Sequence, residues 1–314
     1  MPHPPPALPA DHQGRPATAD DVDALHALVT ECERALHDRA QTDPGGIAAD
    51  LNRPGLIPEL DTLVVHDRAG RLPARAWVNR RSEVDVHPAH RGRGLGAALL
   101  DWAEARARRA GSEAIVQTVP DTDRPAAALL RSRDYQPLVA AWELTYAMAE
   151  EPAVPGPPAG VTVRPFDSGD ARAVHRLVED AFAAWQPRRR SYEEWARHTV
   201  DRAAFAADCS AVALVDGQLV GAVLALDLPD ADGGHLEQVA VRRDHRDRGI
   251  ARLLLRQAFR AFHRHGRRNC TLWTHSDTGA LDLYLRVGMT VSQSSTVFRK
   301  ELGREELVRE ELAP

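Results

Sequence analysis

The sequence has little of several features that would mark a class of protein. Three widely separated cysteines, Cys32, Cys209 and Cys270, match neither a disulfide framework nor a zinc pattern. No apolar run approaches the roughly 20 residues that a membrane-spanning helix needs. A net charge of -5 and a pI of about 6.3 argue against a nucleic-acid partner. We therefore expect a cytoplasmic protein with no bound metal that binds neither nucleic acid nor membrane.

Other features describe a folded chain of two domains. Apolar residues make up 43% of the 314 residues and charged residues 27%, and this length suits about two ordinary domains. Residues 150–160 contain four prolines, which exclude a helix or a central strand and predict a stiff linker. We expect an N-terminal domain at 14–149, a C-terminal domain at 161–314, and a disordered Pro-rich tail at 1–13 without the marks of a secretory signal.

The two domains repeat one another. Arg15-Pro16 opens the first and Arg164-Pro165 the second, and a His-x-Leu-Val segment begins 11 residues after each arginine, at His26 and His175. Such self-similarity at a fixed offset predicts a duplication.

Local patterns predict similar elements in each half. Strands are expected at residues 62–66, 74–78, 211–215 and 219–227, the last two joined by the turn signal Asp216-Gly217. A further strand and helix follow in each half, at 114–119 with 126–132 and at 270–275 with 279–287. A last strand near residues 296–300 is expected to close the second domain.

A strand, a turn and a helix stand at the centre of the second domain. Val239 and Val241 alternate as in a buried strand, and apolar residues recur at helical spacing after the turn. Between them lies Arg-x-x-Gly-x-Ala, with Arg246, Gly249 and Ala251. Because Gly249 and Ala251 keep side-chain bulk away, the first N–H groups of the helix can close on an anion such as a pyrophosphate.

The first domain carries the same pattern, with Arg91, Gly94 and Gly96 between a strand and an amphipathic helix. Both turns resemble the acetyl-coenzyme A binding motif of the GNAT superfamily of N-acetyltransferases, Q/R-x-x-G-x-G/A. The resemblance implies an α/β fold (α+β, mixed sheet) of two tandem GNAT domains, each a mixed, mostly antiparallel sheet flanked by helices. The order of predicted elements independently allows this fold.

The resemblance also implies which residues hold acetyl-CoA. In the second domain they are Val239, Ala240, Val241, Arg246, Asp247, Arg248, Gly249, Ile250, Ala251 and Asp277. In the first domain they are Val84, Asp85, Val86, Arg91, Gly92, Arg93, Gly94, Leu95 and Gly96. Main-chain groups of the strand before the second turn are expected to pair with the pantetheine arm, and an N–H there to polarise the thioester carbonyl.

Acetyl transfer to an amine requires a base, because an ammonium of pKa about 10 must lose a proton before it attacks the thioester. His235 and Glu237 lie 11 and 9 residues before the arginine of the second turn, positions at which GNAT enzymes commonly place the base. Even spacing predicts that both share one strand face with Val239. Histidine would act directly and glutamate through a water, so both stay open. The matching residues of the first domain, Arg80 and Ser82, offer no base.

The departing thiolate, of pKa about 8.5, needs a proton in return. Tyr284 lies seven residues after Asp277 in a segment that resembles N-x-x-A-x-x-x-Y-x-x-x-G-F of the superfamily, with Asp277 in place of Asn and Met289 in place of Phe. The resemblance makes Tyr284 the expected acid. In the first domain the same count from Asp123 reaches Leu130, which has no hydroxyl.

We therefore expect an acetyl-CoA-dependent N-acetyltransferase, monomeric or homodimeric. Its C-terminal domain would acetylate a small-molecule primary amine by direct attack on the thioester, and its N-terminal domain would be non-catalytic. Phe182, Trp185, Tyr192 and Trp195 cluster where the superfamily builds its acceptor pocket, although helix packing also accounts for them.

The alternatives are acetylation of protein N-termini or lysines, and a non-catalytic acetyl-CoA-binding regulatory protein. Tandem architecture, both turns and Tyr284 resemble mycothiol synthase and its relatives. Those enzymes carry Glu where this chain has His235, a difference that argues against their thiol-sugar substrate for this chain.

Overall fold

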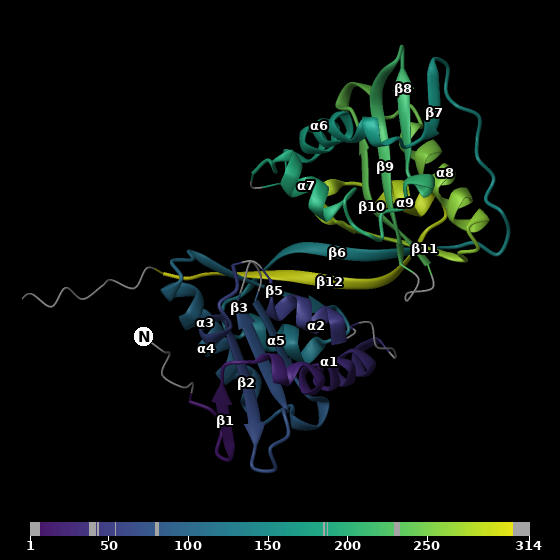
Figure 1. The fold of residues 1–314 in the computed structure, drawn as a ribbon. Helices are drawn as coiled ribbons and strands as arrows, with labels where there is room; N and C mark the ends of the chain where they lie inside the picture. Colours follow the sequence, from purple (N-terminus) through teal and green to yellow (C-terminus); the bar gives the residue numbers. More distant parts are fainter. Residues whose placement is uncertain are drawn as a thin grey trace, which may run out of the picture. The chain divides into compact units, whose positions relative to one another are not determined.

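The computed structural model describes residues 7–37, 42, 44–53, 55–78, 82–184, 186, 188–228 and 233–303. The chain divides into two compact units, which we call unit 1 (residues 1–140 and 295–314) and unit 2 (residues 141–294). Each unit is a mixed sheet flanked by helices (Figure 1), which confirms the predicted fold class.

Unit 1 has the sheet order β1-β2-β3-β4-β5-β12. The β4–β5 pair is parallel and the other pairs are antiparallel. Its strands are β1 (His12–Arg15), β2 (Thr62–Asp67), β3 (Ala74–Val78), β4 (Ser82–Val86), β5 (Ala114–Pro120) and the end of β12 (Thr290–Glu301). Its helices are α1 (Val22–His37), α2 (Pro44–Leu51), α3 (Pro58–Asp61), α4 (Leu95–Arg109) and α5 (Arg124–Arg131).

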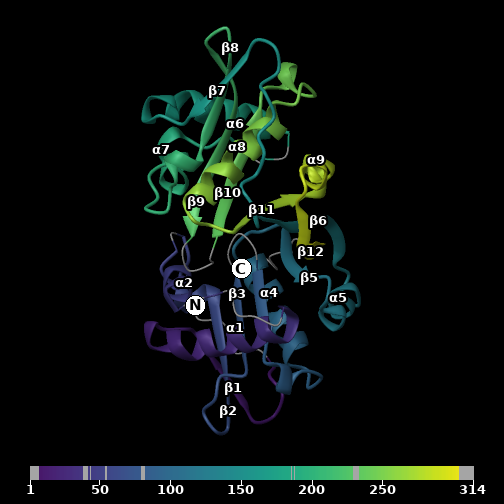
Figure 2. The ribbon, with the colours of Figure 1, turned by 90° about the vertical axis from the view of Figure 1, so that its right-hand side faces the viewer.

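Strand alternation divides the core of unit 1 between two faces. Leu63 and Val65 of β2 pack with the apolar stripe of α4, whereas Val64 between them packs with α1. Figure 2 shows α1 crossing the strands of this unit. Because successive strand side chains point to opposite faces, each face of the sheet needs its own helical cover.

Unit 2 has the sheet order β6-β11-β10-β9-β8-β7, in which only β10 and β11 pair in parallel. Its strands are the end of β6 (Gln136–Ala147), β7 (Val161–Pro165), β8 (Ala211–Val215), β9 (Gln218–Leu228), β10 (Gly233–Val241) and β11 (Asn269–His275). Its helices are α6 (Ala171–Phe182), α7 (Tyr192–His198), α8 (Ile250–Arg264) and α9 (Leu281–Arg286).

The same alternation orders the core of unit 2. Val212 of β8 packs with α6 and α7, whereas its neighbours Ala211 and Ala213 pack with α8. The faces of β10 therefore separate residues on the α6–α7 side from residues on the α8 side.

The last strand of each sequence half completes the sheet of the other unit. Residues 141–147 of β6 pair with β11 in unit 2, with Ala147 opposite Asn269. Residues 295–301 of β12 pair with β5 in unit 1, with Glu301 opposite Ala114. The expectation that the strand near 296–300 closes the second domain is wrong, because its partner belongs to the first sequence half.

The compact units consequently differ from the proposed domain limits at 14–149 and 161–314. At the N-terminus, His12 and Gln13 form part of β1, opposite Asp67 and His66, and are not a disordered tail. Residues 1–6 of the predicted tail lie outside the described residues.

Within the described ranges, no helix combines the length and apolar character needed to cross a bilayer. The same residues contain no cluster of three or more His, Cys, Asp or Glu side chains that could hold a metal ion.

Candidate active site

The candidate site of unit 2 is a cleft between two strands that diverge. β10 and β11 pair only where Gly233, Gly234 and His235 face residues 269–271. Beyond that point, residues 236–241 of β10 and 272–275 of β11 line a cleft of about 610 Å³. The parting of the strands leaves the β11-facing edge of Val239, Ala240 and Val241 open to the cleft, as expected for residues that would pair with a pantetheine arm.

The turn after β10 closes one end of this cleft. Nε of Arg246 donates to the carbonyl oxygen of Val241 at 3.2 Å, which ties the turn to the end of the strand. Asp247 and Gly249 have positive φ angles of 62° and 80°. Gly249 is the N-cap of α8 and supplies no side-chain cap, and a Cβ at Gly249 would have no neighbour within 4 Å.

The first N–H groups of α8 therefore open onto free space, which is the geometry of a helix N-terminus that receives an anion. Most of the predicted turn residues line the cleft, namely Arg246, Asp247, Gly249, Ile250 and Ala251. Arg248 is exposed and its side chain lies outside the lining, so only its main chain is available to the turn.

His235 and Glu237 lie together on the α6–α7 side of β10. Nε2 of His235 is 3.9 Å from Oε2 of Glu237, and Glu237 is 3.8 Å from Arg202. A β-bulge between Leu236 and Gln238 breaks the regular alternation. The prediction that His235 and Glu237 share a strand face with Val239 is therefore wrong. Val239 packs against the core on the α8 side.

The surroundings shift the proton affinities of the two candidate bases in opposite directions. Burial, helped by the positive charge of Arg202, lowers the pKa of His235 to about 4. Burial raises the pKa of Glu237 above its usual range, against the opposing effect of Arg202. A general base works best when its pKa is near the working pH. The environment therefore favours Glu237 over His235 for this role.

Sequence reasoning missed two residues that fix these candidates. Oγ1 of Thr271 lies 2.9 Å from Nδ1 of His235, directly across the parallel pair. Arg202 lies after α7 in the sequence and forms an ion pair with Glu237 of β10. Only the strand register could have revealed the first, and no sequence signal marks the second.

Tyr284 of α9 lines the same cleft as Glu237. The residue is 7% exposed, and burial raises the pKa of its phenol to about 12. The hydroxyl is therefore protonated at neutral pH and has a proton to donate.

Asp277, predicted to contact the coenzyme, is exposed and does not line the cleft. Thr278 takes its place in the lining: its hydroxyl accepts from the N–H of Ala280 at 3.1 Å and donates to the carbonyl oxygen of His275 at 2.8 Å. In unit 1, by contrast, the matching Asp123 caps α5 by accepting from the N–H of Ala126.

The aromatic residues after α6 divide between two roles. Trp195 is fully buried and donates its indole N–H to Oε1 of Gln238 at 2.9 Å, so it packs α7 against β10. Phe182 lines the cleft. Tyr192 meets the ring of His175 edge to face, and Trp185 lies outside the described residues.

Unit 1 contains a corresponding cleft of about 450 Å³. Its predicted coenzyme residues line it, except Arg93, and comprise Val84, Asp85, Val86, Arg91, Gly92, Gly94, Leu95 and Gly96. Nε of Arg91 donates to the carbonyl oxygen of Val86 at 3.2 Å, as Arg246 does to Val241 in unit 2.

The side chains around this cleft differ from those of unit 2. Leu130 lines it where unit 2 has Tyr284. Ser82 stands in place of Glu237 and donates its hydroxyl to the carbonyl oxygen of Val116. Arg80, in place of His235, lies outside the described residues. Asp85, in place of Ala240, forms an ion pair at 2.6 Å with the buried Arg75.

A comparison with protein families matches both sequence halves. The model of the Acetyltransferase (GNAT) family matches residues 75–135 and 172–289, more than half of the chain, and each matched stretch contains one of the two turns.

Several proteins of known family match this chain across both units. The mycothiol acetyltransferase of Corynebacterium glutamicum (strain R) is 24% identical over 80% of this chain and 85% of the relative. That of Catenulispora acidiphila is 27% identical over 91% of this chain and 96% of the relative. A solved structure of a GCN5-related N-acetyltransferase from Sphaerobacter thermophilus is 29% identical, covers 94% of this chain and 97% of its own, and has a TM-score of 0.82.

Proposed function

The chain belongs to the GNAT family of acetyltransferases, and from this membership we propose that unit 2 acetylates the primary amine of a small molecule. The chain is an N-acetyltransferase with acetyl-CoA as the acetyl donor. The observation that supports the active unit is that a carboxylate of raised pKa, Glu237, and a protonated phenol, Tyr284, line one cleft beside the turn.

The residues of unit 2 fit a coenzyme A thioester, which supplies an activated acetyl carbonyl when bound. The uncapped N-terminus of α8 offers N–H donors for a pyrophosphate, and the diverging strands offer main-chain groups for the arm. An N–H of Val239, Ala240 or Val241 would polarise the thioester carbonyl.

Proton transfer is assigned to two side chains, Glu237 and Tyr284. Glu237 accepts a proton from the substrate ammonium, directly or through a water, so that the free amine attacks the carbonyl carbon. A C–N bond forms, the C–S bond breaks, and the phenol of Tyr284 gives its proton to the sulfur. The proton that the attacking nitrogen still carries then passes to the tyrosinate, and Glu237 releases its proton to solvent. His235, with a pKa of about 4, is neutral at pH 7 and contributes a polar wall rather than the base.

The mycothiol acetyltransferases named above support a small-molecule acceptor. The test is to mix the purified chain with acetyl-CoA and a panel of small primary amines and to measure free thiol release and the acetylated product. Product from small amines is expected. Acetylation confined to peptide N-termini or lysines would overturn the acceptor class, and coenzyme binding without turnover on any acceptor would support a regulatory protein.

A further inference from the structure

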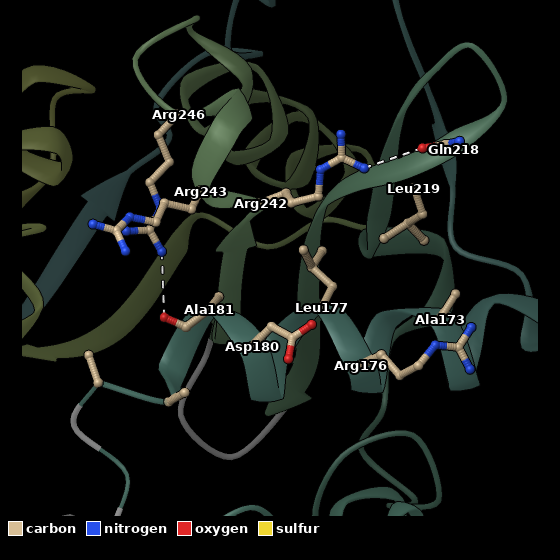
Figure 3. A pocket seen from close by; sticks show the side chains of 12 residues that line it. Ala173, Arg176, Leu177, Asp180, Ala181, Gln218, Leu219, Arg242, Arg243 and Arg246 are labelled. Atoms are coloured by element: carbon tan, nitrogen blue, oxygen red, sulfur yellow. Dashed lines mark hydrogen bonds between the residues drawn. The ribbon is translucent and has the colours of Figure 1, made fainter.

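A second hollow in unit 2, of about 890 Å³, lies beside the turn and has no role in the proposed reaction. One wall is α6, and the other is the segment that follows β10 (Figure 3). Four arginines line it: Arg176 from α6, and Arg242, Arg243 and Arg246 from the opposite wall. In a chain of net charge -5, this is a local concentration of positive charge.

Two of these guanidinium groups have no partner within the described part of the chain. Arg242 is paired with Asp244 at 2.7 Å, and Arg246 is bound to the carbonyl oxygen of Val241. Arg176 and Arg243 form no side-chain hydrogen bond or ion pair with any described residue.

Acidic side chains neutralise the positive charge of the hollow only in part. Asp180 is the one acidic residue among its described lining residues, and it pairs with Arg189 at 2.5 Å. Like charges gathered in one place repel each other unless an anion joins them, so the arrangement favours an anionic ligand.

The floor of the hollow is apolar. Leu177 and Leu219 lie between the charged walls, with Ala173 and Ala181 beside them (Figure 3). A charged rim over an apolar floor suits a ligand that carries both an anionic group and a flat aromatic ring.

The basic set is specific to unit 2. At the positions of Arg176, Arg242 and Arg243, the repeat in unit 1 has Ala27, His87 and Pro88. The repeated fold therefore does not need these arginines, because unit 1 forms the same elements without them.

We propose that this hollow binds the phosphate monoester of a nucleotide, whose flat aromatic base packs on the apolar floor. A phosphate monoester carries a charge of about -1.5 to -2 at pH 7, which matches the two unpaired guanidinium groups of Arg176 and Arg243. Guanidinium groups bind phosphate oxygens in a bidentate manner, and the ring would rest on Leu177 and Leu219.

Two sources can supply such a group. Arg246 and Ala181 line both the hollow and the coenzyme cleft, so the 3′-phosphate of a bound coenzyme A is one source. A free nucleotide is the other. The first source rests on the proposed function, whereas the second does not.

The test compares the wild type with the double variant Arg176→Ala/Arg243→Ala in two measurements. Calorimetry follows the binding of AMP to the free protein and to the protein saturated with coenzyme A. Kinetics compares KM for acetyl-CoA with KM for acetyl-3′-dephospho-CoA. Loss of two charge-assisted contacts should weaken phosphate binding by about tenfold or more.

Arg172→Ala is the matched control, because it removes the same charge from the same helix outside the hollow, where Arg172 stacks on Tyr192 at 4.3 Å. Loss of AMP binding only in the double variant, with KM unchanged, assigns a free nucleotide. A rise in KM for acetyl-CoA but not for the dephospho form assigns the coenzyme. If the double variant matches the wild type in both measurements, the proposal is overturned, and turnover of any amine still stands as independent support for the proposed function.

Discussion

The turns of unit 1 and unit 2 share a backbone conformation and differ in the side chains around them. Gly94 and Gly249 have φ angles of 85° and 80°, and the arginine of each turn donates to the last strand carbonyl at 3.2 Å. Around the turn, unit 2 has Glu237 and Tyr284. Unit 1 has serine and leucine at those places. The comparison teaches that the backbone of the turn and the side chains around it vary independently in this fold.

The two clefts also differ in the charge carried by the strand before the turn, which is β4 in unit 1 and β10 in unit 2. Unit 1 buries Arg75 between Asp85 and Glu83, at 2.6 and 3.1 Å. The matching pair in unit 2, Ala222 and Ala240, packs in the apolar core. A buried ion pair is costly to desolvate and gives little net stability. The same strand position therefore carries a buried charge in unit 1 and an apolar side chain in unit 2.

The largest expected effect comes from removing the candidate base. Glu237→Gln should lower kcat by about 10²- to 10⁴-fold, because the amide cannot accept the ammonium proton. Ser82→Ala, the matched change in unit 1, should leave kcat unchanged. Steady-state thiol release measures both. Equal losses in the two variants would contradict the assignment of catalysis to unit 2.

Removal of the candidate acid should have a smaller effect. Tyr284→Phe is expected to lower kcat by about 10- to 100-fold, because water can partly replace the phenol as proton donor. Tyr135→Phe removes a buried phenol from unit 1 and serves as the control. A wild-type rate for Tyr284→Phe would remove this residue from the mechanism.

The pH profile gives a further distinction, since unit 1 has no counterpart of the Arg202–Glu237 pair. Activity should fall at low pH as Glu237 becomes protonated. Arg202 lowers the pKa values of Glu237 and His235, so Arg202→Ala should raise both and move the acid limb to higher pH. Arg197→Ala, on α7, should leave the limb in place. An unmoved limb in Arg202→Ala would show that neither group controls the rate.

The smallest expected effect is on stability, and it should be equal in the two units. Arg15 pairs with Asp21 and Arg164 with Asp170, each at 2.6 Å, and hydrogen bonding to Arg15 lowers the pKa of Asp21 to about 2. Asp21→Asn and Asp170→Asn should each reduce the free energy of unfolding by about 1–2 kcal/mol.

The pKa values of Asp21 and Asp170 are lower in the folded state than in the unfolded chain. The stability that each ion pair contributes is therefore present above about pH 4 and is lost as pH falls toward 2. Thermal unfolding at pH 7 and pH 3 measures this change. A deficit in the variants that is as large at low pH as at pH 7 would contradict the ionic origin.

Local sequence patterns predicted much of the fold. The expected strands at 62–66, 74–78 and 211–215 correspond to β2 (Thr62–Asp67), β3 (Ala74–Val78) and β8 (Ala211–Val215). These strands show period-two alternation, which depends only on neighbouring residues. Both turns were predicted as well, because a glycine at positive φ followed by a helix leaves a short-range signal.

Long-range pairing could not be predicted. β6 pairs with β11, about 130 residues later in the chain, and β12 pairs with β5 across about 180 residues. The bulge after Leu236 moves Val239 to the other face, and nothing in the residue types marks it. In the same way, Thr278 rather than Asp277 lines the cleft through a hydroxyl contact made only in the folded turn.

The exchange of last strands has a consequence for synthesis. The ribosome releases β1 to β5 early, yet the sixth strand of that sheet ends at Glu301. Until then β5 offers an open edge to any other extended peptide, including a neighbouring nascent chain. Maturation of the first unit should therefore be delayed until Glu301 has been synthesised, and chaperones that shield strand edges should associate with it during that interval.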